Sequence, residues 1–89
     1  MSYRIEVASP ARQEIAGLPG HIRSQARQLI EELGRNPFPG RAKELRDKPH
    51  IYRIWLAGRW RIVYFVDDEL QIVRILRVRR KEEIGYEDI

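Results

Sequence analysis

Apolar and polar positions in the first 40 residues follow one strand pattern and two helix patterns. Residues 3–7 alternate apolar and polar side chains, which is typical of a half-buried strand. Ser9-Pro10 indicates a helix N-cap with proline at the first helical position, and predicts a short helix over 10–16. Apolar side chains at helical spacing over 22–33 predict a second, amphipathic helix that ends at Gly34. This part of the chain is therefore expected to form a strand followed by a helical hairpin.

From residue 52 onward the apolar period changes to two, which predicts strands at 52–56 and 60–66. A two-residue turn between them would mix polar and apolar side chains on each face of the hairpin. A three-residue turn over 57–59, with Gly58 inside it, keeps one face apolar. This register pairs Leu56 with Trp60, Ile54 with Ile62, and Tyr52 with Tyr64.

A further strand is predicted from residue 70 to about 79, after a turn at Asp67-Asp68-Glu69. A two-residue turn at 68–69 extends the apolar face by pairing Tyr64 with Val73 and Ile62 with Ile75. Because side chains alternate along a strand, arginines from separate strands then share the opposite face. Helices packed on the apolar face would leave this basic face open. Its expected arginines are Arg53, Arg61, Arg74 and Arg80, with Trp55 and Phe65 between them.

Positive charge is concentrated in one part of this 89-residue chain, whose net charge is +4. Residues 41–81 hold twelve basic and five acidic side chains, whereas 82–89 hold four acidic side chains and no basic one. A basic stretch of this kind is typical of a protein that binds phosphate groups of nucleic acid, or an acidic protein partner. A solvated basic face is the alternative. A functional face is favoured, because the alternation of side chains along the strands places arginines that are distant in sequence on the same face.

Length and composition exclude several classes of protein. The length allows a single domain over residues 1–89. There is no cysteine, which excludes disulfides, zinc knuckles and thiol catalysis. No apolar run approaches the ~18 residues of a membrane span, and no signal peptide is evident, so a soluble cytoplasmic protein without membrane contact is expected.

Few side chains offer acid–base or metal chemistry. His21 and His50 lie at the ends of different predicted elements, so the sequence does not bring them into one site. Asp67-Asp68-Glu69 is first of all a turn, and no further carboxylates stand at ligand spacing. Phosphate-binding glycine loops and serine triads are absent. No cofactor and no metal are therefore expected, and catalysis would depend on arginine, lysine and tyrosine.

Residues 43–86 resemble the RelE/ParE superfamily of bacterial and archaeal type II toxins. The resemblance rests on Leu45-Arg46, on Tyr52-Arg53-Ile54, on the run from Gly58 to Tyr64, on Arg79-Arg80-Lys81 and on Tyr86. It implies an α+β fold of the RelE-like, microbial RNase-like kind. In that fold an N-terminal strand and helical hairpin pack on a twisted antiparallel sheet of about four strands, and the single domain is a RelE-like toxin.

The resemblance implies two functions. RelE-like toxins are endoribonucleases that cut mRNA in the ribosomal A site, whereas ParE-like toxins inhibit DNA gyrase without a known nuclease site. Three residues that match the nuclease pattern are Arg61, Arg80 and Tyr86. They favour a ribosome-dependent mRNA endoribonuclease that acts without metal, by 2′-hydroxyl attack to a 2′,3′-cyclic phosphate. A basic RNA-binding domain without catalysis is a third interpretation.

Roles for individual residues follow from the same resemblance. The expected catalytic residues are Arg61 and Arg80 on the phosphate and Tyr86 or Lys81 in proton transfer, with the general base left open between the last two. Expected RNA-binding residues are Arg53, Trp55, Lys43, Arg46 and Arg74. Trp55 departs from the pattern, because close RelE relatives carry a basic residue there. The expected partners are a cognate antitoxin protein and the ribosome with mRNA in its A site.

Overall fold

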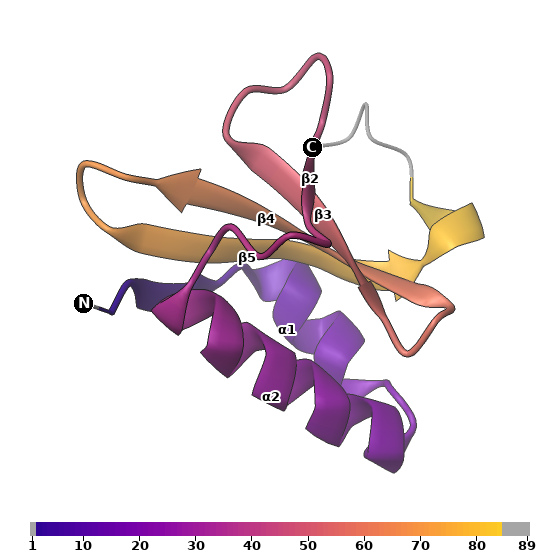
Figure 1. Cartoon of the computed structure of the whole chain (residues 1–89). Helices are drawn as coiled ribbons and strands as arrows, with labels where there is room; N and C mark the ends of the chain where they lie inside the picture. Colours follow the sequence, from indigo (N-terminus) through magenta and orange to yellow (C-terminus); the bar gives the residue numbers. More distant parts are fainter. Residues whose placement is uncertain (1, 85–89) are drawn as a thin grey trace.

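The computed structural model describes residues 2–84 and shows two helices packed against one face of a five-stranded sheet (Figure 1). The strands lie in the order β1-β5-β4-β3-β2. In chain order the elements are β1 (Arg4–Val7), α1 (Ser9–Ala16), α2 (Gly20–Arg35), β2 (Lys43–Glu44), β3 (Ile51–Leu56), β4 (Trp60–Asp67), β5 (Ile72–Arg80) and a 3-10 turn (Lys81–Glu83). The α+β class expected from the sequence is confirmed.

The sheet is mixed, which differs from the expected antiparallel sheet of about four strands. The N-terminal strand β1 forms one edge of the sheet and pairs with β5 in parallel, with Ile5 opposite Val73. The short strand β2 adds a second edge by pairing with β3. A parallel pair needs a crossover between its strands, and the segment from α1 to β4 supplies it. The alternating pattern of 3–7 predicts a strand but contains no information about its partner.

Both helices form where the sequence predicts them, but their ends differ. Ala8, not Ser9, is the N-cap of α1, and no side chain caps it. Helix α2 continues through Gly34 to Arg35, and the Gly34 carbonyl, in the last turn of the helix, accepts a hydrogen bond from the Tyr3 amide at 2.7 Å. A Cβ at Gly34 would lie 3.2 Å from Cδ1 of Ile5, so glycine allows this close approach of helix and strand.

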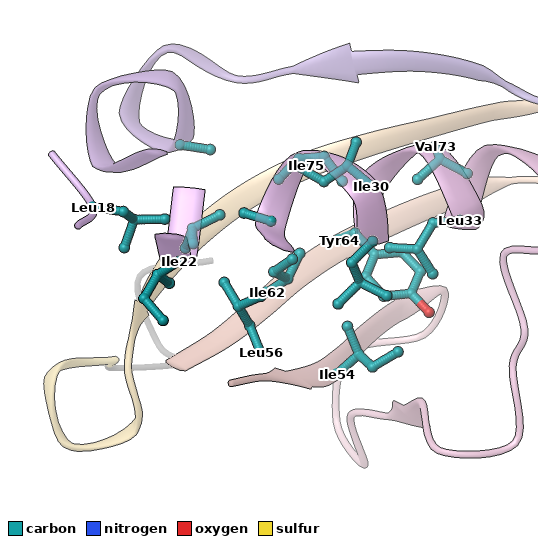
Figure 2. Packing of buried hydrophobic residues seen from close by; sticks show 14 of the residues in the cluster. Leu18, Ile22, Ile30, Leu33, Ile54, Leu56, Ile62, Tyr64, Val73 and Ile75 are labelled. Carbon is teal, nitrogen blue, oxygen red and sulfur yellow. The ribbon is translucent and has the colours of Figure 1, made fainter. Parts of the chain in front are cut away.

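The core lies between α2 and the inner face of the sheet (Figure 2). Tyr64 is fully buried there, and its hydroxyl donates a hydrogen bond of 2.8 Å to the Pro37 carbonyl. Burial raises the pKa of Tyr64 well above its usual value. The core residues of α2 are Ile22, Ala26, Leu29, Ile30 and Leu33, and those of the sheet include Ile54, Leu56, Ile62, Val73, Ile75 and Val78.

The first hairpin has the predicted register, with Leu56 opposite Trp60 across a three-residue turn. Ala57 and Gly58 in this turn both adopt left-handed backbone conformations, with φ of 53° and 78°. Strand β3 therefore presents its apolar side chains to the core, as the sequence indicates.

The second hairpin does not have the predicted register. Its turn contains four residues, 68–71, and Tyr64 lies opposite Ile75 instead of Val73. The Asp67 carboxylate closes this turn by accepting a hydrogen bond from the Leu70 amide, and Gln71 is left-handed. A bulge then shifts the register between Val63 and Tyr64, and this irregularity determines which basic side chains share a face.

Candidate nucleic-acid interface

The outer face of the sheet, opposite the helices, carries a group of basic side chains around one tryptophan. Strand pairing places the members side by side: Lys43 opposite Arg53, Trp55 opposite Arg61, and Arg61 opposite Arg79. Lys81 joins them from the 3-10 turn that follows β5. We call this set the basic cluster; its members are Lys43, Arg53, Trp55, Arg61, Arg79 and Lys81.

Trp55 lies at the centre of the basic cluster. The Arg61 guanidinium carbon lies 4.6 Å from the centre of the Trp55 ring, and Lys81 Nζ lies 5.9 Å from it. Both distances are within the range of cation–π attraction. The Lys81 amide also donates to the Arg59 carbonyl at 3.2 Å, which joins the β3–β4 turn to the end of β5. The structure therefore brings together three predicted site residues from three separate segments.

The expectation that Arg80 shares this face is wrong. The bulge gives β5 one extra residue, Leu76, between Ile75 opposite Tyr64 and Arg77 opposite Val63. One extra residue reverses the alternation of side chains beyond it. Arg80 therefore lies opposite Trp60 with its guanidinium carbon 5.5 Å from that ring, while Arg79 moves to the outer face.

Sequence reasoning missed Arg79, although a local signal for it exists. The run Arg77-Val78-Arg79 alternates charged and apolar side chains, and Val78 is buried in the core. If Val78 is assigned to the core because it is apolar, its two neighbouring arginines must point to the outer face. Counting alternate positions from the preceding turn instead placed Arg80 on the outer face, because the count did not include the bulge.

The remaining predicted RNA-binding residues lie apart from the basic cluster. Arg74 is on the outer face but at the other end of β5, opposite Phe65, where it pairs with Glu6 at 2.9 Å. This ion pair lowers the pKa of Glu6. Arg46 is exposed in the loop between β2 and β3, off the sheet face. Tyr86 lies outside the described residues.

The two histidines lie apart from the basic cluster. His50 contacts Phe65 at 6.4 Å between ring centres, four strand positions or ~13 Å along β4 from Arg61. It lines a hollow of about 310 Å³ with aromatic rings and the β4–β5 turn. His21 lies on α2, on the other side of the sheet. Over residues 2–84, no three histidine or carboxylate side chains are placed to hold a metal ion.

This arrangement supports two kinds of contact with a nucleic acid. Guanidinium and ammonium groups neutralise phosphates, and the Trp55 ring offers a surface on which a base can stack. Among the members of the basic cluster, the lysines can exchange a proton whereas arginine stays protonated, and Lys81 is the lysine that lies beside Trp55 and Arg61. Within the described part of the chain, no helix is long and apolar enough to span a bilayer.

The helical hairpin, the mixed sheet and the basic outer face together define a small toxin domain of the RelE/ParE superfamily. The family model for the ParE toxin of type II toxin-antitoxin systems (parDE) matches residues 5–85, and the chain belongs to this family. No curated protein sequence matches it.

Solved structures share this fold over most of the chain. A chain of the intact E. coli RelBE toxin-antitoxin complex is 29% identical, with a TM-score of 0.80, and the match covers 92% of this chain and 100% of that one. A chain of the RelBE2 toxin-antitoxin complex from Mycobacterium tuberculosis is 27% identical, with a TM-score of 0.77 and coverage of 91% and 100%. The YoeB/ParE toxin from Agrobacterium tumefaciens, at 17% identity, has the same fold with a TM-score of 0.76 and coverage of 86% and 96%.

Proposed function

We propose that this toxin is an endoribonuclease that cuts mRNA on the ribosome through its basic cluster. The observation that carries the proposal is that Arg61 from β4 and Lys81 from the 3-10 turn both lie next to the Trp55 ring on the outer face. A single RNA strand presents a phosphate and a base within the reach of such a group. The likeness to RelE structures at 27–29% identity supports the same function.

The proposed reaction uses the nucleophile that RNA itself carries. The 2′-hydroxyl oxygen attacks the adjacent phosphorus, the bond to the 5′-oxygen breaks, and the products are a 2′,3′-cyclic phosphate and a 5′-hydroxyl. One proton leaves the 2′-hydroxyl and one reaches the departing 5′-oxygen. The protein must hold these atoms in line and stabilise the charge that grows on the phosphoryl oxygens.

Residues of the basic cluster divide this work by position. Arg61 holds the phosphoryl oxygens, which a guanidinium can do through two hydrogen bonds. Lys81 supplies the second positive charge, in the place that the sequence assigned to Arg80. Lys43 and Arg53, paired across β2 and β3, bind the neighbouring backbone phosphates. Proton transfer is assigned to Lys81 or Tyr86, and the choice between them stays open.

The proposed partners are the ribosome and a cognate antitoxin. The six members of the basic cluster are basic or aromatic, and positioning of the mRNA by the ribosome is proposed to assist its cleavage. The E. coli and M. tuberculosis matches are toxin-antitoxin complexes, which supports an antitoxin for this chain too. An acidic segment that folds on the basic outer face would suit its charge.

Purified toxin, ribosomes and a short mRNA test this proposal directly. The wild-type protein is expected to cut the mRNA in the A site and leave 2′,3′-cyclic phosphate ends, and Arg61→Ala is expected to abolish cutting. Arg35→Ala removes the same charge from α2, where Arg35 forms an exposed ion pair with Glu31, and is expected to cut normally. Equal cutting by Arg61→Ala and the wild type would refute the proposal.

Inhibition of DNA gyrase is the second candidate, because the matching family model is that of ParE. In this case the outer face binds protein, and mRNA remains intact. Supercoiling by purified gyrase would then stop when the toxin is added, whereas the nuclease proposal predicts unchanged supercoiling.

A further inference from the structure

One carboxylate, that of Glu14 on α1, contacts three consecutive residues of β5 directly after the bulge. Glu14 Oε1 accepts a hydrogen bond from the Val78 amide at 2.9 Å. Oε2 accepts one from Arg77 Nη2 at 2.8 Å and lies 3.2 Å from Arg79 Nε. The Glu14 side chain is only 19% exposed, so these contacts are shielded from solvent better than the other ion pairs of the sheet.

Glu14 acts where β5 has lost its neighbouring strand. Strand β1 pairs with β5 only as far as Ile75, and α1, which follows β1 in the chain, contacts β5 beyond that point. The Val78 amide would face this edge without a strand partner, and the Glu14 carboxylate replaces that partner. The same contact stabilises the bulged geometry that turns Arg77 and Arg79 outward.

Arg79 is the member of this group that affects the basic cluster. It lies directly opposite Arg61, and like charges at opposite positions of two strands repel each other. Glu14 draws Arg79 toward α1, and Glu83 in the 3-10 turn also pairs with Arg79, at 3.5 Å. Arg61 meanwhile leans the other way, over Trp55 at 4.6 Å.

We propose that Glu14 is a positioning residue for Arg61: by anchoring Arg79 it keeps two opposed arginines apart and holds Arg61 over Trp55. The catalytic consequence of this inference rests on the proposed function, but the position of Arg61 does not. Loss of the Glu14 charge would release Arg79 toward Arg61 and displace the Arg61 guanidinium from the Trp55 ring.

The position of Arg61 is measured by NMR on the full chain, without RNA. In the wild type the Trp55 ring is expected to shift the Arg61 side-chain signals, and Glu14→Gln is expected to reduce this shift by at least half. Glutamine keeps an oxygen for the Val78 amide and removes only the charge. A second substitution, Arg79→Gln in the Glu14→Gln protein, is expected to restore the wild-type signals. Unchanged Arg61 signals in Glu14→Gln, or no restoration in the double variant, would overturn the proposal.

Cleavage of ribosome-bound mRNA is the second measurement made on the same variants. Glu14→Gln is expected to lower kcat about 10-fold without raising KM, since a misplaced catalytic group costs rate more than binding. The double variant is expected to recover kcat. The matched control is Glu6→Gln, which releases Arg74 from a similar ion pair far from Arg61 and is expected to change neither kcat nor the Arg61 signals.

The NMR and cleavage measurements together distinguish failure of the inference from failure of the proposed function. A wild-type protein that does not cut mRNA, with NMR shifts as expected, would refute the nuclease and leave the positioning role of Glu14 intact. A protein that cuts mRNA, but whose Arg61 signals do not change in Glu14→Gln, would support the nuclease and refute the positioning role of Glu14. If Glu14→Gln does not fold, Glu83→Gln replaces it, because Glu83 is half exposed and also holds Arg79. A smaller shift change in the same direction is then expected, and unchanged signals would overturn the proposal.

Discussion

Lys81 and Arg80 are adjacent cations with different surroundings: the bulge in β5 turns Arg80 toward Trp60, and the 3-10 turn after β5 brings Lys81 to Trp55. Lys81 Nζ lies 5.9 Å from the Trp55 ring in the basic cluster, whereas Arg80 lies against Trp60. Lys81→Gln and Arg80→Gln each remove one positive charge at neighbouring positions. Their effects on the net charge are identical, so any difference between them reports where each side chain points.

The expected difference can be worked out from electrostatics. One lost phosphate contact removes ~1 kcal/mol of attraction for unit charges 4 Å apart in water, which is about 5-fold in affinity. It also lowers the slope of log K against log salt by ~0.7 for a single strand. Lys81→Gln is expected to show both effects. Arg80→Gln is expected to weaken binding less than about 2-fold, because screening reduces its attraction to phosphates on the outer face.

The assay is fluorescence anisotropy of a labelled, uncleavable RNA at several salt concentrations. Thermal melting of both variants verifies that the fold is intact. Equal losses in the two variants, or a larger loss in Arg80→Gln, would refute the placement of Lys81 in the RNA-binding surface.

Three further predictions concern Tyr64, Glu6 and Trp55. Tyr64→Phe is expected to cost ~1 kcal/mol through loss of the hydrogen bond to Pro37, measured by urea unfolding. Because burial raises the pKa of Tyr64 in the folded state, the wild type should lose stability as the pH rises above ~10, and Tyr64→Phe should lose less; equal alkaline losses would contradict this. Arg74 lowers the pKa of Glu6, so the wild type should have a higher free energy of unfolding than Glu6→Gln above pH ~4.3. This difference should vanish as the pH falls further, and a difference retained at acid pH would contradict the prediction. Trp55→Ala is expected to weaken RNA binding by ~1–3 kcal/mol if a base stacks there, and Trp55→Phe less; equal affinities of all three proteins would exclude stacking.

The first hairpin and the helices were predictable because their patterns are local. Only a three-residue turn keeps Ile54 and Ile62 on one face, and the structure has this turn. The apolar stripe of α2 likewise predicts its buried side. Three site residues that these patterns place on the outer face, Arg53, Trp55 and Arg61, are found there.

The rest depends on contacts between distant parts of the chain. The bulge at Leu76 is supported by Glu14, more than 60 residues away, and its one local mark is the alternation of charged and apolar side chains over 77–79. Apolar side chains at Ile75 and Leu76 fit either face, so parity counted from the turn gave Arg80 instead of Arg79. The parallel pairing of β1 with β5 joins residues 68 positions apart and has no sequence signal of its own.

The central claim, that Arg61 is part of a nuclease site on the outer face, is tested most directly in growing cells. mRNA 5′ ends are mapped after brief induction of the wild type, Arg61→Ala and Arg35→Ala. New ends inside translated codons, present with the wild type and Arg35→Ala and absent with Arg61→Ala, are the predicted result. Arrested growth with intact mRNA in wild-type cells would contradict the nuclease and direct attention to gyrase.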